Sequence, residues 1–362
     1  MKNEAYLDLL SIGGLGEKRL VRLMDIFGPP EVIFSKSRAE LEETGIGKKV
    51  ASAISSYSRS GEVKKSLEVL KSLDARIITT EDAEYPQLLL NSPAPPPVLF
   101  VRGELRVEEK LVIAIVGTRR ATGYGRAAAE RLARELAARG VLIVSGAARG
   151  IDTLAHKGAL AAGGRTLAVL GCGIDVVYPP ENDRLLETIT ADGAVVSEYI
   201  PGTTPAPGLF PQRNRIIAWL SHGVVTVEAG PKSGALITAR LAADGGRDVF
   251  SVPGGIFSHQ SEGTNQLLKE GAKLVSSIDD VLEEYGTVLE SGQDTREDAT
   301  EGMALSADEK RIYRLLGPEP IHVDKIVDKL GIASASLHPI LLNMELKGVI
   351  KQLPGMRFVK VL

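Results

Sequence analysis

Four short, mainly apolar runs between residues 111 and 228 constrain the fold more than any other feature of the sequence. Each is four to six residues long, is rich in Val, Ile and Leu, ends in a glycine-containing loop and precedes a segment with helical periodicity. Such runs are typical of parallel strands buried on both faces of a sheet. They are Leu111–Val116, Val141–Val144, Thr166–Leu170 and Val224–Glu228. The pattern predicts an α/β fold with a doubly wound sheet.

Basic residues and glycines gather in the loops after these runs and in the segment 210–215, which opens an apolar helix after a Pro- and Gly-rich loop. Ligands of doubly wound sheets bind where such loops converge, and Arg suits phosphate oxygens. The residues expected at this anion site are Gly117, Thr118, Arg119, Arg120, Gly146, Arg149, Phe210, Arg213, Asn214, Arg215, Lys232, Ser233 and Gly234. In the alternative interpretation, Arg213 and Arg215 cap a core helix through ordinary salt bridges.

The composition confines any nucleic-acid site to a local patch. The 362 residues carry a formal net charge of −3, which argues against a bulk polyanion binder. Cys172 is the single cysteine, so a disulfide framework is excluded and a free thiol fits a reducing cytosol. No secretory pattern opens the sequence, and no apolar run approaches the ~20 residues that span a bilayer. We therefore expect a cytoplasmic protein with no membrane partner, metal or cofactor.

Eight ordered motifs over roughly residues 83–284 resemble the DNA-processing protein A family, also called DprA or Smf. Among them are SGAARGIDTLAH from Ser145, FPQRNRIIAWLS from Phe210 and EAGPKSGALITARLA from Glu228. One such motif is a weak signal, whereas eight in order are specific. The resemblance implies a Rossmann-like core that binds single-stranded DNA, protects incoming strands, forms homodimers and loads the RecA recombinase during natural transformation. It also implies no established catalytic activity.

Changes in composition divide the rest of the chain. Residues 1–80 are predicted to form a small helical domain, whose glycine hairpins at 12–16 and 45–47 resemble helix-hairpin-helix or SAM-like units. Backbone N–H groups and lysines of such hairpins can hold a DNA phosphate, although helix C-caps in a small bundle explain the glycines equally well. Residues 81–284 are expected to form the central domain, after a Pro-rich spacer at 91–100, and the acidic stretch 285–304 a flexible linker.

Residues 305–362 are predicted to form a winged helix. A capping box of Ser306 and Glu309 opens the first of three helices, and a hairpin follows the third. The third helix offers only His338 and Lys347 as basic groups, whereas reading of a major groove needs Arg, Asn or Gln on the exposed face. The pattern favours a protein-contact or auxiliary module over a DNA reader.

The sequence lacks two motifs that are typical of nucleotide-binding enzymes. There is no Gly-x-x-x-x-Gly-Lys-Ser/Thr for a triphosphate and no Gly-x-Gly-x-x-Gly for a dinucleotide. The alternative function is a nucleotide-processing enzyme of the phosphoribohydrolase-like group, in which Glu228 and Arg149 act on an N-glycosidic bond. Ser233 and Thr238 would then hold a phosphate. Because Glu228 can equally cap a helix or pair with Arg213, and the flanking domains suit DNA handling, we expect a binding protein and no enzyme.

Overall fold

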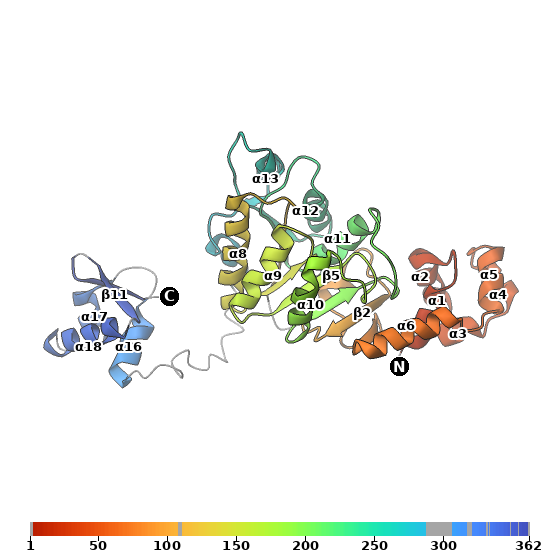
Figure 1. Ribbon diagram of the computed structural model, residues 1–362, viewed down its shortest axis with the longest axis horizontal. Coiled ribbons are helices and arrows are strands. Elements are labelled where there is room, and N and C mark those ends of the chain that lie inside the picture. Colours follow the sequence, from red (N-terminus) through yellow and green to blue (C-terminus); the bar gives the residue numbers. More distant parts are fainter. Residues whose placement is uncertain are drawn as a thin grey trace. The chain divides into compact units, whose positions relative to one another are not determined.

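A computed structural model of the protein describes residues 3–107, 111–286, 306–316, 321–330, 332, 334–347, 349–353 and 355–360. The chain divides into two compact units, Met1–Gly292 and Gln293–Leu362 (Figure 1). Of the linker predicted over 285–304, only Tyr285 and Gly286 belong to the described residues. No helix in the described stretches is long and apolar enough to cross a membrane.

One sheet organises the first unit, and its described strands follow the order β1-β2-β6-β5-β4-β3-β7-β8-β9. The strands are β1 Ala75–Thr79, β2 Val98–Gly103, β3 Val112–Val116, β4 Leu142–Ser145, β5 Thr166–Leu170, β6 Ala194–Ser197, β7 Gly223–Thr226, β8 Asp248–Ser251 and β9 Lys273–Leu274. Neighbours from β6 to β9 run parallel, with Ile113 of β3 opposite Ile143 of β4 and Gly223 of β7. Because the chain winds outward from β3 in both directions, the predicted doubly wound α/β fold is confirmed.

Helices cover both faces of this sheet, because alternate strand residues point to opposite sides. The helices that follow β1 in this unit are α7 Gln87–Leu90, α8 Gly123–Ala138, α9 Ile151–Ala161, α10 Asp183–Thr190, α11 Leu209–Trp219, α12 Gly234–Asp244, α13 Glu262–Lys269 and α14 Asp279–Leu282. Ile113 and Ile115 of β3 belong to one core with α8 and α9. Val112 and Val116 belong to the opposite core with α11 and α12. The loops between strands and helices therefore meet at the ends of the sheet.

Strands β1 and β2 extend the sheet in an antiparallel direction beside β6. Phe100 of β2 pairs with Ile77 of β1 and with Ser197 of β6, and its side chain is fully buried. The sequence predicts only helices before residue 81 and a spacer over 91–100, so it misses both strands. The prolines that precede β2 suggested an extended linker, but an extended backbone is also what an added strand requires.

A set of short helices precedes β1, coloured red to orange in Figure 1. They are α1 Glu4–Leu10, α2 Gly16–Phe27, α3 Pro30–Phe34, α4 Arg38–Glu43, α5 Lys48–Ser55 and α6 Gly61–Ser72. Helices α2 to α5 share a core that includes Leu20, Ile33 and Ile54. Helices α1 and α6 pack on β1 and β2 through residues such as Leu7 and Leu67. The predicted glycine hairpins lie directly before α2 and α5.

The second unit has the element order of a winged helix, as predicted. Its elements are α16 Ala307–Leu315, β10 Ile321–His322, α17 Val323–Leu330, α18 Ser334–Leu346, β11 Ile350–Leu353 and β12 Arg357–Lys360, with the sheet order β10-β12-β11. Its core includes Ile312 and Phe358. Ser306 and Glu309 form the predicted capping box of α16. Lys347 pairs with the buried carboxylate of Glu309 at 2.8 Å, so this lysine stabilises the unit and is a poor candidate for a DNA contact.

Candidate nucleic-acid interface

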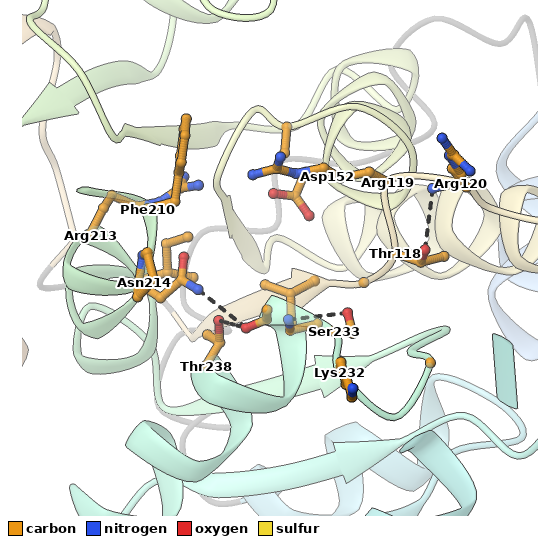
Figure 2. A pocket seen from close by; sticks show the side chains of 18 of the residues that line it. Thr118, Arg119, Arg120, Asp152, Phe210, Arg213, Asn214, Lys232, Ser233 and Thr238 are labelled. Atoms are coloured by element: carbon orange, nitrogen blue, oxygen red, sulfur yellow. Dashed lines mark hydrogen bonds between the residues drawn. The ribbon is translucent and has the colours of Figure 1, made fainter. Parts of the chain in front are cut away.

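A cavity of about 950 Å³ lies at the carboxyl ends of β3 and β7, where the strand order reverses. Its walls come from the loops after these two strands, the start of α9 and the first turns of α11. Figure 2 shows Thr118 and Arg120 on one side of it and Phe210 and Asn214 on the other. Such switch points are the usual ligand sites of doubly wound sheets, so this cavity is the candidate binding site.

Most residues predicted for the anion site meet in this cavity. Those that line it are Gly117, Thr118, Arg119, Arg120, Phe210, Arg213, Asn214, Lys232, Ser233 and Gly234. Gly146 and Arg149 line a smaller neighbouring cavity, which shares Arg119, Phe210 and Arg213 with the first. Arg215 lines neither of the two. The motif spacing thus predicts that the loops converge, but not the direction in which each Arg of α11 points.

Three exposed cations, Arg119, Arg120 and Lys232, form the rim of the cavity. Among the described residues, none forms an ion pair with any of the three. Local hydrogen bonds order the loops that carry them: Arg120 N–H donates to Thr118 Oγ1 at 3.2 Å, and Ser233 Oγ accepts from the first turn of α12. Unpaired cations on ordered loops are suited to an anion from outside the protein.

The ring of Phe210 is half-buried between two side chains. The guanidinium of Arg119 lies over the ring at 5.0 Å from its centroid, and the ring of Tyr178 lies at 5.5 Å with a 37° tilt. The sequence analysis did not single out Tyr178, because its position in the fold depends on the loop after β5. A base that stacks here must displace the guanidinium or stack on its outer face, since Arg119 covers the ring.

Arg213 supports the cavity floor from inside the protein. Its side chain is only 3% exposed, and Nη1 donates to the carbonyls of Val169 and, at 2.7 Å, Gly146. Burial lowers the pKa of Arg213, although the nearby charge of Asp152 opposes this effect. The sequence did hold a signal for this placement: Ile216 and Ile217 follow Arg213 at helical spacing and are buried on the same face. Arg213 is therefore a buried residue in the structure and not an exposed cation that could contact a phosphate at the rim.

Asp152 is a cavity residue that the sequence analysis missed. Its carboxyl group is buried at the start of α9 and lines the cavity with Arg213. Burial raises the pKa of Asp152 to about 6, against the charge of Arg213. Ala155 and His156 continue the same buried stripe at helical spacing, which was the available signal. Because a carboxylate on the floor repels anions, a bound phosphate is favoured at the rim, near Arg119.

Arg215 joins the helical region to the central sheet. Its Nη2 group donates to Glu17 of α2 at 2.7 Å and to Glu198, and Nη1 donates to the carbonyl of Ala94 at 3.2 Å. Burial raises the pKa of Glu198 to about 7, although the charge of Arg215 opposes the shift. The structure therefore gives Arg215 the salt-bridge role that the sequence analysis held as its alternative, and places it away from the cavity.

Arg149 and Gly146 lie beside the cavity rather than in it. Arg149 is exposed and pairs with Glu181, with 3.0 Å between Nη2 and Oε2. Gly146 is buried, and a Cβ added there would lie 2.1 Å from Nη1 of Arg213. Glycine at this position thus makes room for the buried guanidinium. Exposed ion pairs contribute little to stability, so Arg149 remains available to exchange Glu181 for another anion.

Glu228 holds the start of α8 and does not line the cavity. Its buried carboxylate accepts from the backbone N–H of Thr122 at 2.9 Å and from the Thr122 hydroxyl. Thr122 in turn caps α8 by accepting from Gly125 N–H. This is a helix-start role, and the acid that the phosphoribohydrolase-like alternative uses is not among the residues that line the cavity. Among the described residues, no group of His, Cys, Asp and Glu is arranged to hold a metal ion.

Two family models match successive parts of the chain. A model of DNA recombination-mediator protein A matches residues 76–286, and a model of the DprA winged helix domain matches residues 296–356. The chain belongs to the DNA-processing protein A (DprA/Smf) family. The resemblance inferred from the ordered motifs is thereby confirmed.

Full-length relatives and solved structures support the assignment. Protein Smf of Synechocystis is 35% identical over 98% of this chain and 97% of its own, and Protein Smf of Escherichia coli is 36% identical over 97% and 94%. The crystal structure of DprA from Streptococcus pneumoniae superposes with a TM-score of 0.70 at 34% identity, covering 78% of this chain and 98% of the other. The structure of DNA processing protein A from Helicobacter pylori, which describes a single-stranded DNA binding mode, superposes with a TM-score of 0.53 at 34% identity. This match covers 59% of this chain and 96% of the H. pylori chain.

Proposed function

We propose that this protein is a single-stranded DNA-binding recombination mediator that grips the sugar–phosphate backbone at the cavity rim. The observation that carries the proposal is a set of three exposed cations around a cavity at the switch point of the sheet. Arg119, Arg120 and Lys232 form no ion pair with any residue that the structure describes. Phe210 and the Arg119 guanidinium supply a stacking surface for a splayed base. The single-strand binding mode of the H. pylori relative supports the choice of ligand.

The proposal also covers what happens to the DNA strand after it is bound. We infer that the protein protects incoming single strands and transfers them to the RecA recombinase during natural transformation. This step takes place in the cytoplasm, for which a buried free thiol at Cys172 is suited. We propose a role of binding without catalysis, which the hydrogen bonds of Glu228 to Thr122 at the start of α8 support. Parallel titrations with a single-stranded oligonucleotide, matched duplex and mononucleotides test it: saturable single-strand binding supports the proposal, whereas turnover of a mononucleotide supports the enzyme alternative.

Replacing Arg119 and Lys232 together by Ala should weaken single-strand binding and flatten its salt dependence. Because each neutralised phosphate of a single strand contributes about 0.7 to the log–log slope, we expect the slope to fall by about 1.4. Fluorescence anisotropy across a salt series measures both quantities. Arg139→Ala with Lys157→Ala is the matched control, since both residues are exposed and outside the cavity. Equal losses in the two double variants would refute the assignment.

We also propose that the protein acts as a homodimer through the first unit. Ile256 is 80% exposed and Phe257 97% exposed, in the loop that leads to the cavity residues His259 and Gln260. Large apolar side chains this exposed favour burial against a second copy. Two cavities on one particle would raise the effective concentration of a long strand.

The homodimer predicts a specific sedimentation result. The full chain should sediment as a dimer at micromolar concentration, and Ile256→Ser with Phe257→Ser should convert it to a monomer. Because both side chains are exposed, the variant should melt at the wild-type temperature. A wild-type chain that sediments only as a monomer would contradict the proposal.

A further inference from the structure

A second cavity, of about 270 Å³, lies where the helical region meets the sheet. Its walls come from the end of α1, the first turn of α2, the start of β2, the loop after β6 and the first turn of α11. We call it the junction cavity. It shares no lining residue with the central cavity, so the proposed function of that cavity does not use it.

The charges at the junction cavity do not balance. Two carboxylates line it, Glu17 and Glu198, and the described lining includes no basic residue. Both carboxylates accept from Nη2 of Arg215, Glu17 through its two oxygens at 2.7 and 2.9 Å and Glu198 through Oε2. One guanidinium therefore serves two carboxylates, which leaves one excess negative charge when both are ionised.

Glu198 also has an acceptor that the protein leaves unused. Its side chain is only 8% exposed, and Oε1 is buried without a hydrogen-bond partner among the described residues. The hydroxyl groups of Tyr199 and Tyr85 donate to backbone carbonyls instead, at 3.0 and 2.7 Å. A buried acceptor without a donor is unfavourable, so a donor from outside the chain would be stabilised there.

The arrangement of acceptors favours a compact cation. A guanidinium binds a carboxylate best through two parallel hydrogen bonds, but Arg215 already donates to Oε2 of Glu198 and to both oxygens of Glu17. An ammonium group is a point charge with three rotatable donors, and it can use a single oxygen. The apolar part of the lining suits a hydrocarbon stem. It consists of Leu10, Pro96, Pro97, Val98 and Ile200.

We propose that the junction cavity binds a primary ammonium group on an apolar stem, with Glu198 as its main acceptor. The cation would balance the excess negative charge and give Oε1 a donor. The stem would lie against the apolar lining. Two sources share this chemistry, namely a free alkylamine and a lysine side chain of another protein.

The test uses the full chain with n-butylammonium chloride as the probe, in calorimetric titration and thermal melting. We expect saturable binding of one probe per chain and a higher melting temperature. n-Butanol has the same stem without a charge, and tetramethylammonium has a charge without an N–H donor, so neither should bind. A lysine peptide with blocked ends distinguishes the sources: binding at least as tight as that of the probe indicates a side chain, and weaker binding indicates a free amine.

Glu198→Gln removes the charge but keeps the side-chain volume, and it should lower the affinity for the probe roughly tenfold or more. Glu187→Gln is the matched control, because Glu187 also pairs with an arginine but is exposed and lies outside the cavity. Both variants should bind single strands like the wild type, since neither residue lines the central cavity.

The pH dependence of binding is a second readout. Burial raises the pKa of Glu198 to about 7, opposed by the charge of Arg215 and assisted by that of Glu17. Burial also raises the pKa of Tyr85 and Tyr199, so both are neutral in this range. Because the ammonium group pairs with the ionised carboxylate, affinity should fall about tenfold from pH 8 to pH 6. This fall should be absent in Glu198→Gln.

Three results would overturn the proposal: no saturable binding of n-butylammonium by the wild type, equal binding of either control compound, or equal losses in Glu198→Gln and Glu187→Gln. Thermal melting checks that each variant is folded. Glu17→Gln is a second variant, at a more exposed carboxylate. It leaves Arg215 and Glu198 in balance, so it should also weaken probe binding, and wild-type affinity in both cavity variants would contradict the site.

Discussion

Arg213→Ala should lower the unfolding free energy of the first unit by about 3–5 kcal/mol, as expected when one member of a buried charged network is removed. The substitution deprives the carbonyls of Gly146 and Val169 of a buried donor. It also removes the favourable charge of Arg213 from the buried carboxyl group of Asp152. Urea unfolding followed by circular dichroism measures the loss.

Arg120→Ala is the control for Arg213, because Arg120 lines the same cavity but is exposed. Its unfolding midpoint should stay near that of the wild type, since exposed substitutions shift stability by about 0.5 kcal/mol or less. If Arg213→Ala unfolds like the wild type and loses single-strand binding, the residue is a direct DNA contact and its structural role is refuted.

Acid should destabilise the first unit through His156, which is fully buried. Thr166 Oγ1 donates to the carbonyl of Ile143, so it accepts from Nδ1–H of His156 at 2.7 Å. Nε2 then carries the lone pair and has no hydrogen-bond partner among the described residues. Burial, with help from the charge of Arg213, lowers the pKa of His156 to about 3. The imidazole is therefore neutral in the folded protein at every pH above this value.

The sign of the effect follows from the lowered pKa. The unfolded chain takes up the proton first, so this contribution to stability is present above pH ~6.5 and is lost as the pH falls towards 3. The loss approaches about 1.4 kcal/mol per pH unit, and about 4–5 kcal/mol over the whole range. Melting temperature against pH should fall less steeply for His156→Gln than for the wild type.

Two comparisons isolate His156 in that experiment. His259→Gln should keep the wild-type pH dependence, because His259 is exposed. The raised pKa of Asp152 acts in the opposite direction, since its carboxyl group holds a proton in the folded state up to about pH 6. Asp152 is unchanged in both variants, so its contribution cancels in the comparison. Identical pH profiles for His156→Gln and the wild type would contradict a neutral, buried imidazole.

The parallel core of this fold could be predicted because its signals are local. Thr166–Leu170 is a strand with the predicted bounds. β3 differs from its prediction by one residue at its start, and β4 and β7 differ by one or two residues at each end. Each strand is buried on both faces, which produces a continuous apolar run, and each ends at a glycine loop. Together, these two features predict where each loop leaves the sheet. They therefore also predict that the loops that carry Arg119 and Lys232 converge.

Side-chain direction within the site could not be predicted to the same extent. The motif from Phe210 to Arg215 predicted two arginines near a helix start. In α11, however, Arg213 is buried and donates to the carbonyl of Gly146, whereas Arg215 donates to Glu17. Glu17 is 198 positions away in the sequence, and no local pattern reveals such a partner. Helical periodicity alone would have assigned Arg213 to the buried face, because Ile216 and Ile217 share it.

The antiparallel pairing of β1 with β2 determines where the chain can be truncated without exposing a strand edge. β1 is an outer strand of the sheet, and β2 behind it carries the apolar sequence Val98–Val101, all buried. A fragment that starts at Glu81 would lose β1 and uncover the hydrogen-bonding edge of β2. Unpaired apolar edges template intermolecular strand pairing. Such a fragment is therefore expected to aggregate through β2, whereas one that begins before Ala75 keeps its own protective strand.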